Sequence, residues 1–357
     1  MRIEPLSEED EKFLDRASKL LDINKYGSFL LKWAHALESY GTPRDFVYST
    51  TYDSAPVKIN NQAYSFIMVT SANNAMRREL MAKQKHYEFK DNLKSYGVRL
   101  ADDITSCFLC QNVLQAIDAK NYPDEVEDNV IDDLGMHLIL PNRYPAEYGH
   151  SLSVLRNHDD ISIRVKPVPV PEEKTAMYKP EPGKTRGNIF GADYLEVMIE
   201  GCDKHHLIGL RNHVLEGMSI PGHDHFQIFP EDLPRFSQTK AVTDDKQSTG
   251  FGSNVYLAQN TPFDTLLIAS EESKPISDAA IPLLKRMEEG NQIFTLFYHQ
   301  GVLFVSPRIM ERFDDKRQQV GACMPIHAVD VSPEETLRRA IIYMPMKGQY
   351  DWAKYMP

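Results

Sequence analysis

Three polar side chains alternate within one apolar segment near the middle of the chain. In GMSIPGHDHFQIFP, residues 217–230, they are His223, His225 and Gln227. On an extended strand residues i, i+2 and i+4 point to one side, so the three side chains would share a face. A neutral imidazole there can attack phosphorus, and the amide can donate to a phosphoryl oxygen. The alternative is an exposed polar edge strand without chemistry.

Two cysteines and two histidines form a second candidate group. Cys107 and Cys110 lie in CFLC, and His158 and His223 follow further along the chain. Zinc favours four nitrogen or sulfur ligands in a tetrahedron, and a Cys-x-x-Cys pair supplies two of them. Buried free thiols or a redox pair would have the same spacing, and His150 is an alternative to His158. A closed site with these four ligands would hold a structural zinc ion, but the spacing alone leaves the free-thiol and redox alternatives open.

These segments carry a resemblance to a known family. CFLC, LSVLRNHDD and GMSIPGHDHFQIF together resemble the histidine triad superfamily. They are most similar to its galactose-1-phosphate uridylyltransferase branch, which includes the diadenosine tetraphosphate phosphorylases and the GDP-sugar phosphorylases. The resemblance covers residues 105–230 and, weakly, the C-terminal third. In that branch one histidine becomes nucleotidylated, and another joins two cysteines and a further histidine at zinc.

The resemblance implies a role for each matching residue. His225 would be the nucleophile, and Gln227 would bind the transferred phosphoryl group. The remaining matches are the zinc ligands Cys107, Cys110, His158 and His223, and the substrate contacts Ser219 and Asn212. Two positions depart from the pattern: Gly222 is an extra residue before the first histidine, and Phe226 replaces a small residue. Phe226 is closer to the GDP-sugar phosphorylases than to the uridylyltransferases.

Cationic side chains should accompany these residues. Negative charge on the non-bridging phosphoryl oxygens must be stabilised during the reaction. We assign substrate binding to Arg143, in PNRYP, and to Arg211, in LRNH, with Arg156, Lys184 and Arg186 as further candidates. We expect the Arg143 loop to meet the His225 strand where strand ends converge.

The resemblance implies a nucleotidyltransferase or phosphorylase that uses a covalent nucleotidyl-histidine intermediate. Its substrate would be a nucleoside diphosphate sugar or a dinucleoside polyphosphate, and its acceptor phosphate or a sugar phosphate. Members of the superfamily with glutamine at the third position of the alternating segment tend to transfer the nucleotidyl group rather than hydrolyse it, and Gln227 follows that pattern. The rivals are a nucleotidyl hydrolase and a non-catalytic, zinc-stabilised nucleotide-binding protein.

The elements that must position these residues are readable from periodicity. Helices are predicted over residues 7–22 and 26–40. Residues 166–183 are rich in proline and are predicted to form an extended arm or long loop. The order from 137 to 230 is strand, strand, insertion, helix, strand, strand, and it returns weakly after 263. We therefore expect an α+β fold: a histidine triad-like antiparallel sheet with flanking helices, a degenerate internal duplication and an N-terminal helical extension. We expect the N-terminal extension to span residues 1–100, the half with the active site residues 101–235, and the degenerate second half residues 236–357.

Composition narrows the class of protein and its surroundings. The chain has 357 residues, 42% hydrophobic and 25% charged, which is typical of a globular protein. Its net charge of −11 argues against a broad grip on nucleic acid or an anionic membrane. No apolar run reaches membrane-spanning length, and the N-terminus lacks a signal pattern, so we expect a cytoplasmic protein. A homodimer is compatible with the sequence.

Overall fold

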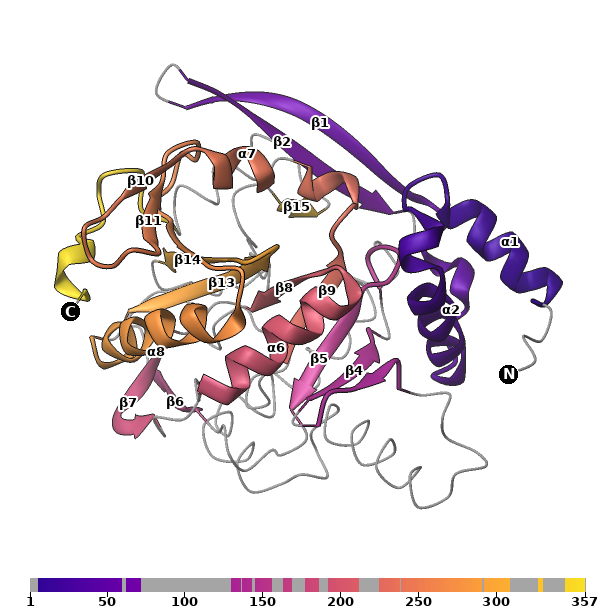
Figure 1. Cartoon of the computed structure of the whole chain (residues 1–357), viewed down its shortest axis with the longest axis horizontal. Helices are drawn as coiled ribbons and strands as arrows, with labels where there is room; N and C mark the ends of the chain where they lie inside the picture. The colour runs from indigo at the N-terminus through magenta and orange to yellow at the C-terminus, as the bar shows by residue number, and fades with distance from the viewer. Residues whose placement is uncertain are drawn as a thin grey trace.

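The computed structural model is shown in Figure 1. It describes residues 6–59, 62–71, 130–135, 137–142, 145–155, 163–168, 177–185, 192–211, 225–237, 239–290, 292–308, 327–329 and 344–356. These residues form a mixed α+β protein built on a ten-stranded antiparallel sheet, as the sequence predicts. Within this described part of the chain, no helix is long and apolar enough to cross a membrane.

The ten-stranded sheet has the order β10-β11-β12-β14-β13-β8-β9-β5-β4-β3. Its strands are β3 (Asp132–Asp133), β4 (His137–Pro141), β5 (Ser151–Leu155), β8 (Leu207–Arg211), β9 (His225–Pro230), β10 (Lys246–Ser248), β11 (Val255–Ala258), β12 (Leu266–Ala269), β13 (Ile293–His299) and β14 (Val302–Arg308). The strand order reads the same from both edges towards the β8–β13 pair. On each side, three strands lie between the edge of the sheet and a central antiparallel pair, which is β8–β9 in one half and β13–β14 in the other.

Two helices cover one face of this sheet. They are α6 (Ala192–His205) and α8 (Ser273–Glu289), which lie side by side in Figure 1. Buried apolar side chains of α6, such as Leu195 and Ile199, join the main core beneath them. The predicted order of strand, strand, helix, strand, strand is confirmed for β4, β5, α6, β8 and β9, and it returns as β11, β12, α8, β13 and β14.

The first helices begin at side-chain caps. In α1 (Glu8–Ala17) the Ser7 hydroxyl accepts from the Asp10 N–H, and in α2 (Ile23–Ser39) Asp22 accepts from the Asn24 N–H. The predicted first helix runs too far, because α1 ends at Ala17 and a turn follows. The side chains that α1 and α2 bury include Phe13 and Trp33, whose rings stack 6.1 Å apart.

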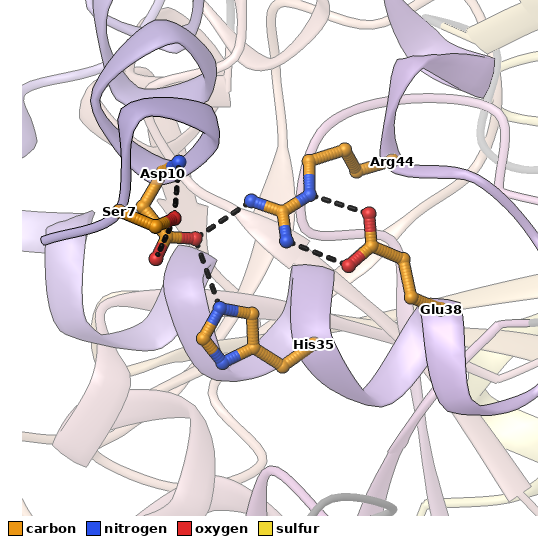
Figure 2. A network of polar contacts seen from close by, with 5 residues as sticks. All are labelled: Ser7, Asp10, His35, Glu38 and Arg44. Atoms are coloured by element: carbon orange, nitrogen blue, oxygen red, sulfur yellow. Dashed lines mark hydrogen bonds and ion pairs between the residues drawn. The ribbon is translucent and has the colours of Figure 1, made fainter.

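A polar network joins α1 to α2 and to η1 (Arg44–Val47) (Figure 2). Asp10 accepts from Ser7 Oγ and Arg44 Nη1, both at 2.7 Å, and from His35 Nε2 at 2.9 Å. Arg44 also donates to both carboxylate oxygens of Glu38. Burial acts to raise the pKa of Asp10, but these hydrogen bonds outweigh it and hold that pKa well below its ordinary value.

Two smaller sheets complete the described strands. β1 (Thr50–Ile59) and β2 (Gln62–Ser71) form a long antiparallel hairpin, and β15 (His327–Val329) pairs parallel to β2. Figure 1 shows this hairpin running along the side of the molecule away from α6 and α8. β6 (Ile163–Val168) and β7 (Met177–Thr185) pair with each other, so the predicted proline-rich arm is a two-stranded sheet at its ends.

The C-terminal segment packs back on the second half of the sheet. Short helical elements there and after β9 are η7 (Trp352–Lys354), η6 (Pro234–Phe236) and α7 (Thr239–Asp244). The Asp264 carboxylate accepts from the backbone N–H groups of Gly348, Gln349 and Tyr350. This carboxylate anchors the last described residues beside β12.

Candidate functional site

The predicted nucleophile and amide lie in β9, between β5 and β8. Val154 is opposite His225, and Gln227 is flanked by Leu152 on one side and Leu210 on the other. Residues paired in this way share a face of the sheet, and the two-residue alternation puts His225 and Gln227 on the same face. The predicted shared face is therefore present for this pair. His225 is buried and Gln227 is half-buried.

The packing of α6 shows which face this is. A Cβ added to Gly209 would lie 2.6 Å from Met198 Sδ and 3.1 Å from Cys202 Sγ, so the Gly209 side of β8 is covered by α6. Phe226 lies on that side too, with its ring 5.6 Å from the Tyr194 ring of α6. His225 and Gln227 alternate with Phe226, so they occupy the opposite side, which we call the Gln227 face.

Arg211 is not brought to the Gln227 face. It is paired with Leu296 and lies two residues after Gly209, so the alternation of β8 places it on the side covered by helices. Its side chain is fully buried. The structure thus separates Arg211 from Gln227, whose immediate neighbour in β8 is Leu210. The physical reason is that adjacent residues of a strand point to opposite faces. The sequence does not show that Leu210, and not Arg211, is the residue of β8 that pairs with Gln227.

Aromatic rings continue the Gln227 face away from His225. Phe229, two residues after Gln227, contacts the Phe236 ring at 5.9 Å, and Phe236 contacts Phe297 at 6.0 Å. The guanidinium of Arg235 lies over two of these rings, 4.0 Å from the Phe229 centroid and 4.6 Å from the Phe236 centroid. These contacts make an apolar floor with one cation stacked on it.

A buried ion pair connects this floor to the β4–β5 connection and to the long hairpin. Arg235 Nε lies 2.9 Å from Glu147 Oε1, and both side chains are buried. The Tyr52 hydroxyl of β1 donates to Glu147 Oε2 at 3.1 Å. Burial, followed by the negative charge of Glu147, raises the pKa of Tyr52 far above its ordinary value. Tyr52 therefore stays a neutral donor.

This ion pair was missed by the sequence analysis. Glu147 and Arg235 belong to different segments, and no spacing rule connects them. The available signal was compositional: each is a charged residue among apolar and aromatic neighbours, in PAEYGH and in DLPRF. Such a position indicates a buried charge, which needs a partner, but the partner's identity comes only from the tertiary fold.

The β4–β5 connection leaves the sheet at the far end of β9 from His225. Ser151 is opposite Ile228, whereas Val154 is opposite His225. At about 3.4 Å per residue, the two levels are about 10 Å apart. The connection therefore reaches the Gln227 face beside Phe229, where His150 stacks on the Phe229 ring at 4.2 Å.

His150 is also unsuited to replace His158 at a metal. Its Nδ1 accepts from the Ala146 N–H at 3.0 Å, and its Nε2 lies 3.0 Å from the Asn142 side-chain amide. Both ring nitrogens are thus engaged inside the connection. The alternative in which His150 ligates zinc is wrong for this arrangement, because a metal ligand needs a free nitrogen lone pair.

Other predicted site residues lie outside the described residues. They are Ser219, Asn212, Arg143, Cys107, Cys110, His158 and His223. Among the residues that the structure describes, no group of three or more histidine, cysteine, aspartate or glutamate side chains could hold a metal ion. Cys202 is buried, and burial raises the pKa of its thiol well above the ordinary value.

The fold and the His225–Gln227 pair define an α+β protein with a two-residue polar pair on one face of a helix-covered antiparallel sheet. No protein-family model and no curated protein matches the sequence. The chain is similar in structure to yeast Ap4A phosphorylase Apa2. One Apa2 structure shares 12% identity, covering 92% of this chain and 98% of that one, with a TM-score of 0.48. The Apa2 structure with AMP is 13% identical, covering 90% of this chain and 92% of that one, with a TM-score of 0.42. The Apa2 structure with Ap4A is 13% identical, covering 87% of this chain and 90% of that one, with a TM-score of 0.42.

Proposed function

We propose that this protein is a nucleotidyltransferase of the phosphorylase type, with His225 as its nucleophile. The observation that carries the proposal is the position of His225 and Gln227, two residues apart on one face at the start of β9. The substrate class, a nucleoside diphosphate sugar or a dinucleoside polyphosphate, follows from the sequence resemblance.

The proposed reaction is a double displacement at the α-phosphorus. A ring nitrogen of neutral His225 forms the phosphorus–nitrogen bond, and the bond to the leaving phosphate oxygen breaks with its electron pair. An oxygen of the acceptor phosphate then forms a new phosphorus–oxygen bond, and the electron pair of the phosphorus–nitrogen bond returns to the imidazole. Gln227 donates its amide N–H to a non-bridging oxygen in both steps.

The surroundings of the pair suit this role. Val154 and Leu152 on β5 and Leu210 on β8 are buried apolar neighbours across the strands. An apolar setting strengthens hydrogen bonds to a charged phosphoryl group and limits attack by water. This favours transfer over hydrolysis, in agreement with the glutamine at position 227.

A structural zinc ion is part of the proposal. Two thiolates and two imidazoles, from Cys107, Cys110, His158 and His223, are a donor set that zinc prefers. The pairing of Val154 with His225 means that the chain leaves β5 towards His158 and enters β9 from His223 at the same end of two adjacent strands. The ion would hold these strand ends together. Metal analysis of protein purified without added metal tests this part.

We also propose that the two similar halves of the sheet arose by duplication. The strand order supports this, since β8, β9, β5, β4 and β3 correspond to β13, β14, β12, β11 and β10, and α6 corresponds to α8. The halves differ at the hairpin. Residues 212–224 connect β8 to β9, whereas Gln300 and Gly301 alone connect β13 to β14, both with positive φ. The two-residue turn between β13 and β14 therefore has no room for a histidine-bearing loop like residues 212–224.

Intact-mass measurement tests the proposed function directly. The protein is mixed with Ap4A, GDP-, UDP- or ADP-sugars without phosphate, and one of them should add one nucleoside monophosphoryl group. His225→Ala should abolish the adduct, and Gln227→Ala should slow its formation. His206→Asn is a matched control, since His206 is exposed and has a φ of 54° that asparagine tolerates.

The same experiment separates the rivals. Release of the adduct by added phosphate supports the phosphorylase, and equally fast release by water alone supports the hydrolase. Tight nucleotide binding with no adduct for any substrate would contradict the proposal in favour of a binding protein.

A further inference from the structure

The described part of the β4–β5 connection, residues 142 and 145–150, is closed by a single imidazole. His150 Nδ1 accepts the Ala146 N–H at 3.0 Å, and Nε2 meets the Asn142 side chain at the same distance. The backbone adds two bonds, from the Asn142 N–H to the His150 carbonyl and from the His150 N–H to the Glu147 carbonyl. The ring is buried. We call the described residues 142 and 145–150 the His150 loop. The His150 ring holds Asn142 and Ala146 of this loop close to itself.

These contacts select one protonation state of the ring. A backbone N–H can only donate, so Nδ1 must present its lone pair to Ala146. A neutral imidazole with a bare Nδ1 carries its proton on Nε2. The structure places the amide nitrogen Nδ2 of Asn142 at 3.0 Å from Nε2. Because that nitrogen cannot accept, we infer that the Asn142 amide is turned by about 180° and that its oxygen accepts from Nε2. A proton on Nδ1 would face the Ala146 N–H and remove the bond. The arrangement is compatible with the neutral Nε2–H tautomer alone.

The same ring holds the His150 loop against β9. It stacks on Phe229 with the rings 26° from parallel, and the His150 carbonyl accepts from the Trp33 indole of α2 at 3.0 Å. Gly149 has a φ of 67°, and a Cβ there would lie 2.8 Å from Pro230 and 3.2 Å from Phe29. The loop therefore packs without spare room against Pro230 at the end of β9, three residues from Gln227.

We propose that His150, as a neutral imidazole, is a positioning residue that locks the His150 loop onto β9, and that protonation of this ring weakens nucleotide binding on the Gln227 face. The inference rests on the proposed function for the nucleotide. The link between ring and face is physical: the His150 ring contacts Phe229, and Glu147 of the same loop pairs with Arg235, which covers Phe229. Release of the loop would disturb both contacts to β9.

Several charged and titratable groups lie on the elements that pack against the His150 loop. Glu147 belongs to the loop, Arg235 follows β9, and Tyr52 belongs to β1. On the α2 side, Lys25 pairs with Glu231 just after β9, and His205 contacts Phe29. The two ring-nitrogen bonds described above run to a backbone amide and to a neutral side chain. Protonation of Nδ1 would break the first of them.

The first measurement identifies the tautomer. Histidine ring nitrogens are labelled with nitrogen-15 and followed by NMR between pH 8 and pH 5, and the His150 signals are identified by their loss in His150→Asn. We expect the neutral Nε2–H form at pH 8. An Nδ1–H tautomer or an imidazolium at that pH would overturn the proposal, and this result needs no substrate.

The second measurement follows AMP binding by calorimetry over the same range. In His150→Asn the side-chain oxygen can still accept from Ala146, but the ring stack and the bond to Asn142 are lost, so affinity should fall about tenfold at pH 8. His150→Gln, which can reach Asn142 but not Ala146, should bind AMP with a similar loss. His206→Asn should bind AMP as the wild type does.

The pH dependence is read as the ratio of wild-type to His150→Asn affinity, because titration of the AMP phosphate affects both equally. The ratio should fall from about ten towards one as the ring becomes protonated. A ratio that stays constant, or equal affinities at pH 8, would overturn the positioning role. If the wild type shows the expected tautomer but binds none of AMP, GMP and UMP, the lock is supported and the proposed function is refuted.

Discussion

The buried pair of Arg235 and Glu147 offers the most quantitative test of the packing described above. Its Nε–Oε1 distance is 2.9 Å, and the side chains of Arg235 and Glu147 are 4% and 0% exposed. At an effective dielectric constant of about 20, Coulomb's law gives about 6 kcal/mol of attraction at this separation. Removal of water from both groups opposes it, so the pair's net contribution is smaller than its attraction.

Removing one partner leaves the other charge buried and alone. Arg235→Met keeps apolar contact with Phe229 and Phe236 but isolates Glu147, and Glu147→Gln isolates Arg235. Each change should cost about 3–5 kcal/mol of unfolding free energy. The double variant buries no lone charge, so it should lose about as much as one single variant rather than their sum.

Urea unfolding at pH 7 provides the assay. Fluorescence of the two buried tryptophans, Trp33 and Trp352, and circular dichroism are followed together to establish that the transitions coincide. Lys12→Met is the control, because the Lys12–Glu8 pair is 67% and 81% exposed and should contribute less than about 1 kcal/mol. Additive losses in the double variant would refute the argument that the two charges stabilise each other across the Gln227 face.

Three further predictions follow from other parts of the molecule. Phe226→Ala should lower the unfolding free energy by about 3–5 kcal/mol, since Phe226 is fully buried against Tyr194, and a loss below about 1 kcal/mol in urea unfolding would contradict its position under α6. Asp10→Asn should destabilise the protein at pH 7. The folded-state pKa of Asp10 lies below its unfolded value, so this stabilisation is present above about pH 4 and declines as the pH falls towards the folded pKa. In thermal unfolding from pH 7 to pH 2, the difference in melting temperature between the wild type and Asp10→Asn should therefore shrink. A constant difference would count against the network. Cys107→Ser should remove the proposed zinc, as elemental analysis would show, and lower the melting temperature; equal metal content in the variant would exclude Cys107 as a ligand.

Local patterns were sufficient for much of the secondary structure. The two N-terminal helices and the order of strands around α6 depend on residues within a few positions of each other. The alternation of His225 and Gln227 belongs to the same class, because the two-residue repeat of a strand is a local property. The end of α1 was misjudged because apolar side chains of the following turn, such as Leu21, are buried without being helical.

Partners that lie far apart in the sequence could not be predicted in this way. Glu147 meets Arg235, and Trp33 meets the His150 carbonyl, only because β4, β5, β9 and α2 converge at one end of the sheet. Each contact depends on the register of several strands at once. No residue type or spacing at either partner carries that information.

By itself, then, the sequence determined which side chains share a strand face, since backbone geometry makes that alternation obligatory. It left open which face points to the helices. Only the tertiary structure decided this, through the close approach of Gly209 to Met198 and Cys202 on α6, which places Arg211 under the helices and His225 and Gln227 on the other side. The pairing of β5 with β9 also brought the His150 loop to Phe229. The physical reason is that which face of a strand is buried depends on the elements that pack against it, and not on the strand alone.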